Sequence, residues 1–299
     1  MSLVSLVKAD SSSAFKKAIE RSLSLIGFHF PEGLQRIAVK PNMCLFMDYS
    51  TGQTTDPKIV AALIDCIREK ASRELDISIV ESDTEARKFE HVSTFLGYKK
   101  MSQEERVALV NLSEDRSQEV EVKVADHSYQ FLLPDTIRNA DLFVNVPKMK
   151  LHPRAKVSCA LKNVYGCNPC PEKSRYHPHL AEAIVGMNKL MKPHLNLVDA
   201  VIVQGKGTRK LGLIVASSDP VAIDSAAATI IGANAKKIRV ITLAAREGVG
   251  NMNYKAAGES LESFAKRFPK RSTVDEIRIK VNKAVLSATK KAGLNAQSF

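Results

Sequence analysis

Short runs of apolar residues alternate along the chain with segments in which apolar residues recur every three or four positions. Residues 37–43 and 76–82 show the first pattern and are predicted strands, while residues 56–72 show the second and are a predicted helix. An Asp-Pro pair at residues 56–57 supplies a helix cap followed by proline in the first turn. A strand, a helix and a strand in this order predict two parallel strands joined by a right-handed crossover.

The same alternation continues toward the C-terminus. Residues 119–134 alternate with period two around Asp126 and His127, which predicts a β-hairpin. Residues 141–147 are almost entirely apolar, as in a central strand that is covered on both faces. The other predicted elements are a helix at 84–98 that ends near Gly97, strands at 106–113, 194–203 and 210–219, and a helix at 219–232.

Together these elements predict the fold class. It is α/β, with a mostly parallel, Rossmann-like sheet, helices on both faces and an inserted β-hairpin. No internal repeat, low-complexity tract or linker forces a domain boundary. Residues 1–299 are therefore predicted to form a single α/β domain, with a small inserted lobe at about 100–180.

Composition narrows the class of protein. The 299 residues are 44% hydrophobic and 25% charged, which is typical of a globular soluble protein. No apolar run approaches the ~20 residues needed to cross a bilayer, and the first residues lack the features of a signal peptide. Five cysteines, an odd number, argue against a disulfide scaffold and for a reducing compartment. We therefore expect a cytoplasmic protein without a membrane partner.

The net charge of +12 is concentrated in two segments. Residues 147–177 hold seven basic side chains and one acidic one, and residues 255–299 hold ten basic and four acidic ones. The second segment has a helical period, so its lysines form a solvated outer face, and whether that helix binds a partner stays open. Its apolar face is formed by Ile277, Val281, Val285 and Leu286. We do not expect nucleic-acid binding, because only 6% of the residues are aromatic, tryptophan is absent and no known module is visible.

Polar residues that suit anion binding follow the predicted strands, and ligands of open parallel sheets bind where strands end. They are Lys40, Asn42, Thr54 and Thr55, then Glu81, Ser82 and Asp83, then Lys148, Lys150 and His152, and finally Ser217, Ser218, Asp219 and Asp224. The threonines and Asp219 can equally serve as helix caps. Asp224 lies on an apolar helix face and needs a partner, either a lysine or a metal. No phosphate-loop motif and no G-x-G-x-x-G motif is present.

The cysteines suggest a second chemistry. Cys167 and Cys170 form a C-x-x-C pair followed by proline, a spacing that suits a shared metal or a redox pair. Cys44 follows the Lys40 loop and is the candidate third ligand, and the histidines at 177 and 179 could complete the set. The alternative is that these thiols lie in loops and bind nothing.

Eight motifs follow one another in a fixed order along the chain: VKPNM (39–43), TTDP (54–57), IVESD (79–83), FLGY (95–98), DLFVNVPKMKLH (141–152), ALKNVYGC (160–167), LVDAVIV (197–203) and LGLIVASSDPVAID (211–224). With these motifs the chain resembles the family described as "domain of unknown function 362", whose members are also labelled iron–sulfur centre proteins. The resemblance extends over most of the chain and implies an α/β fold, but it implies no settled reaction. Many members append a ferredoxin-like module with repeated C-x-x-C-x-x-C runs, which this chain lacks, and Cys170 stands where a small residue is expected.

Two hypotheses about function follow. In the first, the protein is an enzyme or an enzyme-like binder of a small phosphorylated or carboxylated molecule, held in a Lys- and His-lined cleft at the strand ends. His152 is the expected proton carrier, with Lys150 or Lys162 orienting the anion. The expected ligand-binding residues are Lys40, Asn42, Thr54, Thr55, Lys148, Asn163, Lys173, Asp219 and Asp224. In the second, the protein uses Cys44, Cys167 and Cys170 to bind an iron–sulfur cluster or another metal, and it has a redox partner.

The first hypothesis makes a spatial prediction. The amines of Lys40, Lys148 and Lys162, which are far apart in the chain, should converge on one pocket whose occupant is negatively charged. A more distant similarity, to the lactate racemase group with its nickel-pincer nucleotide, rests on the lysines and histidines after a strand that ends in proline, and we assign no nickel chemistry from it.

Overall fold

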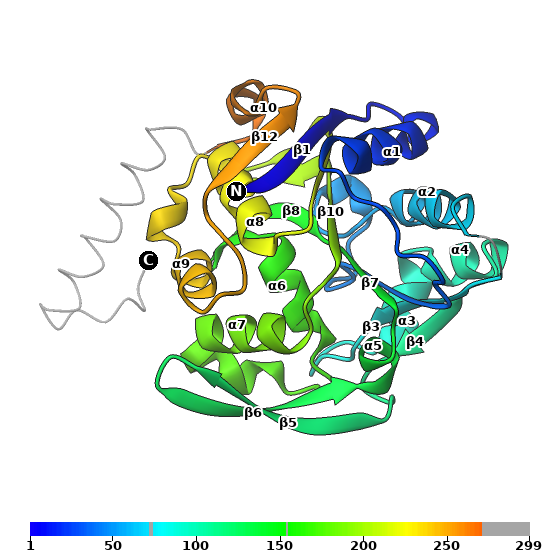
Figure 1. The fold of residues 1–299 in the computed structure, drawn as a ribbon, viewed down its shortest axis with the longest axis vertical. Coiled ribbons are helices and arrows are strands. Elements are labelled where there is room, and N and C mark those ends of the chain that lie inside the picture. The colour runs from blue at the N-terminus through cyan, green and yellow to red at the C-terminus, as the bar shows by residue number, and fades with distance from the viewer. Residues whose placement is uncertain (72–73, 154, 271–299) are drawn as a thin grey trace, which may run out of the picture.

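The computed structural model describes residues 1–71, 74–153 and 155–270. Within these ranges the main sheet has the strand order β12-β1-β11-β10-β7-β2-β3-β4, and β8 and β9 extend it beside β10. The predicted α/β fold with a mostly parallel sheet is confirmed (Figure 1). The basic helix expected near 277–286 lies outside the described residues. The strands of the main sheet are β1 (Ser2–Lys8), β2 (Arg36–Pro41), β3 (Asp76–Glu81), β4 (Ala108–Asn111), β7 (Leu142–Val146), β8 (Lys148–His152), β9 (Lys156–Ser158), β10 (Leu195–Gln204), β11 (Thr208–Ser217) and β12 (Tyr254–Gly258).

Parallel pairing runs from β10 through β7, β2 and β3 to β4. The sheet changes direction at β11, which pairs antiparallel with β10 because the three residues between them are too few for a parallel connection. β1 was not expected from the sequence. It pairs antiparallel with β11, with Ser5 opposite Ala216, so its partner lies too far along the chain for a local pattern to reveal it.

Helices cover both faces of the sheet, as predicted (Figure 1). The side chains of the central strands alternate between two apolar clusters. Val39 and Val144 pack with α1 and α2, whereas Ala38 and Phe143 pack with α7 and α8 on the other face. The helices are α1 (Phe15–Leu25), α2 (Pro57–Arg68), α3 (Phe89–Phe95), α4 (Tyr98–Glu104), α5 (Asp135–Arg138), α6 (Ala160–Val164), α7 (Leu180–Leu190), α8 (Pro220–Ile231), α9 (Arg239–Arg246) and α10 (Leu261–Arg267).

The predicted hairpin forms a separate two-stranded sheet of β5 (Ser117–Val124) and β6 (His127–Pro134). It packs against α7, where a Cβ atom at Gly186 would lie 2.5 Å from the ring of Phe131. Glycine at this position therefore permits the close approach of the hairpin to the helix.

The helix predicted at 84–98 begins later than expected, at Phe89. Thr84 and Arg87 form a short antiparallel bridge through their backbone groups, and the carboxylate of Asp83 accepts a hydrogen bond from the N–H of Phe89 at 2.8 Å. This turn competes with the first helical turn. The predicted end is confirmed, because Gly97 adopts a left-handed conformation with φ of 81°.

A buried ion pair joins β8 to β10. The Lys148 ammonium lies 2.9 Å from the Asp199 carboxylate, and the two side chains are 1% and 0% exposed. Asp199 also accepts hydrogen bonds from the backbone N–H groups of Asp56 and Val201, at 2.9 and 3.0 Å. The pair therefore fixes the start of α2 as well as the two strands.

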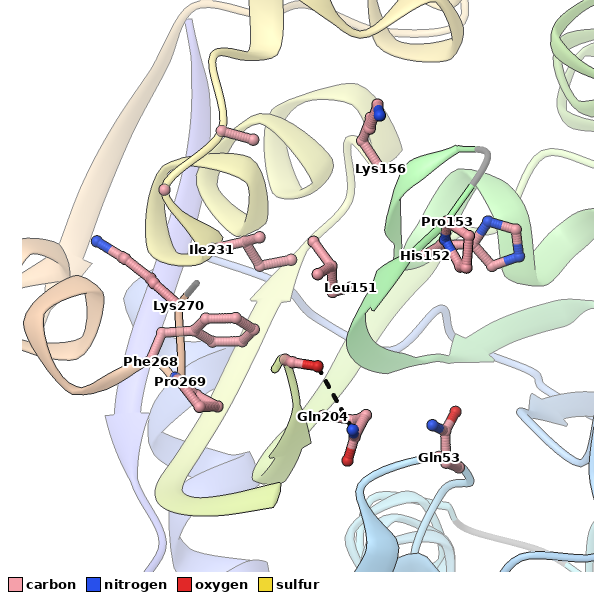
Figure 2. A pocket seen from close by; sticks show the side chains of 13 residues that line it. Gln53, Leu151, His152, Pro153, Lys156, Gln204, Ile231, Phe268, Pro269 and Lys270 are labelled. Carbon is pink, nitrogen blue, oxygen red and sulfur yellow. Dashed lines mark hydrogen bonds between the residues drawn. The ribbon is translucent and has the colours of Figure 1, made fainter. Parts of the chain in front are cut away.

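His152 is the last residue of β8 and is not part of the Lys148–Asp199 ion pair. Its Nδ1 accepts a hydrogen bond of 3.0 Å from the N–H of Ala155. Together with Gln204 and Phe268, His152 lines a cavity of 510 Å³ (Figure 2).

The Asp224 carboxylate is hydrogen-bonded to backbone N–H groups at the start of α6. This carboxylate, on α8, accepts hydrogen bonds from the N–H groups of Ala160 and Leu161, at 2.7 and 3.3 Å, and so caps α6. The sequence had suggested a lysine or a metal, and the backbone supplies the partner instead. Burial raises the pKa of Asp224 to about 7, although the bond from Ala160 opposes this shift.

We expect the variant Asp224→Asn to change how stability depends on pH. Asp224 titrates near pH 4 in the unfolded chain and near pH 7 in the folded protein, so the folded state binds more protons between these values. The free energy of unfolding of the wild type should therefore fall, relative to the variant, as pH rises from about 4 to about 7. Urea titrations across this range measure the difference. Asp126→Asn, in the exposed hairpin turn, is the control, and equal pH profiles for Asp224→Asn and the wild type would contradict the assignment.

Loss of the buried ammonium at Lys148 should destabilise the fold strongly. Lys148→Met leaves the Asp199 carboxylate buried without a counter-charge, and such a loss costs about 3–5 kcal/mol. Adding Asp199→Asn should restore much of this free energy, because asparagine is neutral and its oxygen can still accept hydrogen bonds. Urea unfolding of both single variants and the double variant measures the coupling. Additive effects would show that the pair is not coupled.

Candidate functional site

The direction of the chain connections reverses at β2. From β2 the chain proceeds through α2 to β3 and on to β4, whereas β7 lies on the other side of β2. In an open parallel sheet, such a switch point leaves a crevice beyond the carboxyl ends of the two strands. Lys40 and Asn42 lie at the end of β2, and Asn145 lies near the end of β7.

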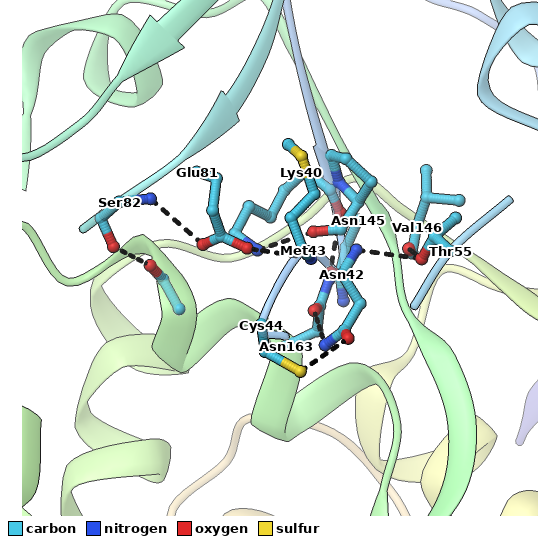
Figure 3. A network of polar contacts seen from close by, with 12 residues as sticks. Lys40, Asn42, Met43, Cys44, Thr55, Glu81, Ser82, Asn145, Val146 and Asn163 are labelled. Atoms are coloured by element: carbon cyan, nitrogen blue, oxygen red, sulfur yellow. Dashed lines mark hydrogen bonds and ion pairs between the residues drawn. The ribbon is translucent and has the colours of Figure 1, made fainter. Parts of the chain in front are cut away.

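A network of buried asparagines joins these strand ends (Figure 3). Asn163 on α6 donates to the carbonyl of Lys40 at 3.0 Å and to Asn145 at 2.8 Å, and it accepts from Asn42 at 2.9 Å. Asn145 in turn donates to Asn196 on β10 at 2.8 Å. The network fixes α6 against both strands, so the predicted residues Asn42 and Asn163 hold the site together.

Asn145 was not among the predicted site residues. The available signal was one asparagine in an otherwise apolar strand, since a fully buried amide must be hydrogen-bonded.

Lys40 forms a buried ion pair at the end of β2 (Figure 3). Its Nζ lies 2.8 Å from Glu81 on β3 and 2.7 Å from the carbonyl of Pro41. Glu81 also accepts hydrogen bonds from the N–H groups of Met43 and Ser82, at 3.2 and 3.1 Å. Glu81 was noted as a strand-end residue but was not placed in the site. It neutralises Lys40 and orders the loop after β2.

A cavity of 240 Å³ opens beside this ion pair. Its wall includes the basic side chains of Lys40, Lys162, Lys173 and Arg87, against the single carboxylate of Glu81. The aromatic ring of Phe89 and the side chain of Val92 supply an apolar side. The cavity thus combines a positive charge excess with partial exclusion of water.

Three groups in this wall have no hydrogen-bond partner within the described residues. The ammonium of Lys162 and the guanidinium of Arg87 form neither a hydrogen bond nor an ion pair there, and the hydroxyl of Thr84 is buried without a partner. Burial lowers the pKa of Lys162. Cys44 and Glu81 oppose this effect, whereas the ammonium groups of two neighbouring lysines add to it.

The other lysines of the cluster already donate hydrogen bonds. Lys173 donates to Ser82 at 2.8 Å and to the carbonyl of Asp83, and burial lowers its pKa. Lys150 donates to the carbonyl of Gln53 at 2.6 Å and lies 3.2 Å from the thiol of Cys44. Lys150 is therefore next to the cavity, and Cys44 lies in its wall.

The structure brings together only part of the predicted set. Lys40, Asn42, Lys162, Asn163 and Lys173 line the cavity. The spatial prediction is met by Lys40 and Lys162 but not by Lys148, whose ammonium is paired with Asp199 outside this wall. His152 lines the other cavity, so its expected cooperation with Lys162 does not fit the structure. Asp224 is used to cap α6.

The remaining predicted residues, Thr54, Thr55 and Asp219, form hydrogen bonds that stabilise the fold. Thr54 donates to the carbonyl of Met47 at 2.6 Å. Thr55 donates to the carbonyl of Val146 at 2.8 Å and accepts from the N–H of Asn42, which ties β2 to β7. Asp219 caps α8 by accepting from the two N–H groups that follow Pro220. Asp219 therefore has the helix-cap role that the sequence suggested, whereas the cap of α2 is Asp56 and not Thr54 or Thr55.

The cysteines do not form a metal site in the part of the chain that the structure describes. No group of three or more His, Cys, Asp or Glu side chains lies close enough there to hold a metal ion. Cys167 is fully buried, and burial raises its pKa to about 12, which disfavours the thiolate that binds metals. Cys44 and Cys170 are only partly buried. Within the described residues Cys44, Cys167 and Cys170 are not grouped as metal ligands, and the metal site stays a prediction.

Two solved structures are similar to this chain at low sequence identity. The lactate racemase apoprotein from Thermoanaerobacterium thermosaccharolyticum aligns with a TM-score of 0.43 and 12% identity, over 73% of this chain and 54% of that one. A protein from Thermotoga maritima aligns with a TM-score of 0.43 and 9% identity, over 80% of this chain and 60% of that one.

A curated protein is more similar in sequence. The thylakoid-associated protein of Synechocystis sp. is 30% identical over 125 residues, which cover 38% of this chain and 38% of that protein. In the described ranges, no helix has both the length and the apolar character needed to cross a membrane. The cytoplasmic location stays a prediction.

The family resemblance seen in the sequence motifs is confirmed by a family model. The model described as "Domain of unknown function (DUF362)" matches residues 37–229, which is more than half of the chain. The matched stretch begins in β2 and ends in α8, so it contains the asparagine network, both ion pairs and the cavity at the strand ends. The chain belongs to the DUF362 family.

Proposed function

We propose that the cavity beyond β2 and β3 binds a small anionic molecule, either phosphorylated or carboxylated, and that the protein is an enzyme or an enzyme-like binder of it. The observation that carries the proposal is the set of unpartnered donors in one wall. Lys162, Arg87 and the Thr84 hydroxyl have no acceptor within the described residues, and all three line the same cavity.

The free energy of charge burial supports an anionic occupant. Partial removal of an ammonium or guanidinium group from water is unfavourable unless an opposite charge or an acceptor compensates. Glu81 cannot serve both Lys40 and Lys162 equally, because its carboxylate already accepts from Lys40 at 2.8 Å and from two backbone N–H groups. A bound phosphate or carboxylate would supply acceptors for Lys162 and Arg87 at once.

The size of the cavity limits the ligand. Its 240 Å³ lies below the ~300–1,000 Å³ of typical drug-sized sites, so the ligand is a small metabolite rather than a nucleotide or a peptide. Arg87 offers a planar fork that can hold two oxygens of a carboxylate or a phosphate. Lys162 and Lys173, whose pKa values burial lowers, can exchange protons nearer to neutral pH than ordinary lysines.

Removing the unpartnered ammonium should weaken anion binding. A hydrogen bond to a charged group contributes about 1.5–3 kcal/mol, so Lys162→Met should raise the Kd for phosphate or oxalate by about ten- to hundredfold. Isothermal titration calorimetry with both anions measures the change. The matched control is Lys17→Met, an exposed lysine on α1. Equal affinities for the wild type and Lys162→Met, or no binding of either anion to the wild type, would count against the proposal.

Binding should also depend on pH through Lys162. The protonated amine attracts the anion, so the affinity for oxalate should decrease as pH rises through the pKa of Lys162. Because burial lowers this pKa below 10.5, the decrease should begin at a lower pH than for an ordinary lysine. In Lys162→Arg the decrease should flatten, because arginine stays protonated. Calorimetry at a series of pH values tests this, and a decrease that persists unchanged in Lys162→Arg assigns it to another group.

A further inference from the structure

We propose that Lys162 forms an imine with the carbonyl carbon of a small anionic aldehyde or ketone that binds in the cavity beyond β2 and β3. This inference rests on the proposed function and names its substrate class. The anionic group of the substrate lies at Arg87, and the carbonyl group lies at the Lys162 amine.

The hydrogen bonds single out Lys162 among the lysines of the cluster. Lys40 donates to Glu81 and Pro41, Lys150 donates to the carbonyl of Gln53, and Lys173 donates to the Ser82 hydroxyl. In each of these groups acceptors already occupy N–H donors of the amine. Lys162 has no hydrogen-bond acceptor within the described residues.

The surroundings of Lys162 favour the neutral amine, which is the nucleophile. Burial is the main cause, and the charges of Lys150 and Lys40 act in the same direction. An amine that is desolvated and lies next to other cations is activated for attack on a carbonyl group. Lys40 and Lys150, fixed by their own hydrogen bonds, thus raise the reactivity of Lys162 without reacting themselves.

The chemical step is balanced without any oxidant or reductant. The lone pair of the Lys162 nitrogen forms a bond to the carbonyl carbon while the second C–O bond breaks, and one proton passes from the nitrogen to the oxygen to give a neutral carbinolamine. The hydroxyl of the carbinolamine then takes up a second proton and leaves as water, and the nitrogen releases its remaining proton, which leaves the C=N bond. Lys173 lines the same cavity, and burial lowers its pKa, so its ammonium can donate the proton that the leaving hydroxyl needs.

The unpartnered cation and hydroxyl explain why the carbonyl compound should be anionic. Arg87 can bind a carboxylate or a phosphate through two parallel hydrogen bonds, and Thr84 can donate a third. Both residues lie on the turn before α3, whereas Lys162 lies on α6, so the two ends of a small substrate would contact different elements. A neutral carbonyl compound has no anionic group for Arg87 to bind.

Reductive trapping tests the inference with the full-length protein. The protein is incubated with sodium cyanoborohydride and one of three carbonyl compounds: pyruvate, dihydroxyacetone phosphate or neutral acetone. Intact-mass and peptide mass spectrometry then locate any adduct. We expect one adduct at Lys162 with pyruvate or dihydroxyacetone phosphate, and which of the two reacts distinguishes a carboxylate from a phosphate. Labelling at Lys162 should exceed that at exposed lysines, because a lower pKa leaves a larger fraction of the amine neutral.

Two controls separate the outcomes. Lys162→Arg keeps the charge but cannot form an imine, so it should lose the adduct while its circular dichroism stays that of the folded protein. Oxalate should reduce labelling of the wild type by competition. If oxalate or phosphate binds in calorimetry but no adduct forms at Lys162, or if the label spreads equally over exposed lysines, the imine is disproved and the proposed anion site stands. If no anion binds either, the proposed function fails as well.

Discussion

Polar groups at the carboxyl ends of the central strands are buried, and each must find its partner inside the protein. This constraint explains the local architecture. Asn163 donates to groups on β2 and β7, Lys40 pairs with Glu81, and Lys148 pairs with Asp199. A buried amide or ammonium that lacks a partner destabilises the fold, so these contacts also determine where α6 and the following loop lie. The Lys162 ammonium, the Arg87 guanidinium and the Thr84 hydroxyl, which find no hydrogen-bond partner within the described residues, line one cavity.

Three lysines of this region differ in the partners of their ammonium groups, and this difference gives them different roles. Lys148 is fully enclosed and fixes two strands and the start of α2. Lys40 is equally buried, but its ion pair with Glu81 forms part of the cavity wall. Lys162 lines the same wall and has no hydrogen-bond acceptor among the described residues. The number of acceptors near each amine, more than its exposure, separates structural lysines from the candidate reactive one.

Much of the fold could be predicted from local patterns, because strands and helices have short periods. The apolar run that became β7, the capping role of Asp56 and the hairpin turn near Asp126 all depend on neighbouring residues. The site was only partly predictable, because its contacts join residues far apart in the chain. The strand ends indicated Lys40 and Lys162, but the pairing of Lys148 with Asp199 depends on the register between β8 and β10, which a single sequence does not reveal.

Some residues of the cavity wall connect several strands, whereas others lie on a short turn. The asparagine network and the ion pairs connect several strands, so changes there disturb the whole sheet edge. The turn that carries Thr84 and Arg87 is closed by its own backbone bridge, and the Glu85 carboxylate joins it to Ser174. Under the proposed function, substitutions at Thr84 or Arg87 would change which anion the cavity accepts while the asparagine network and the ion pairs stay intact.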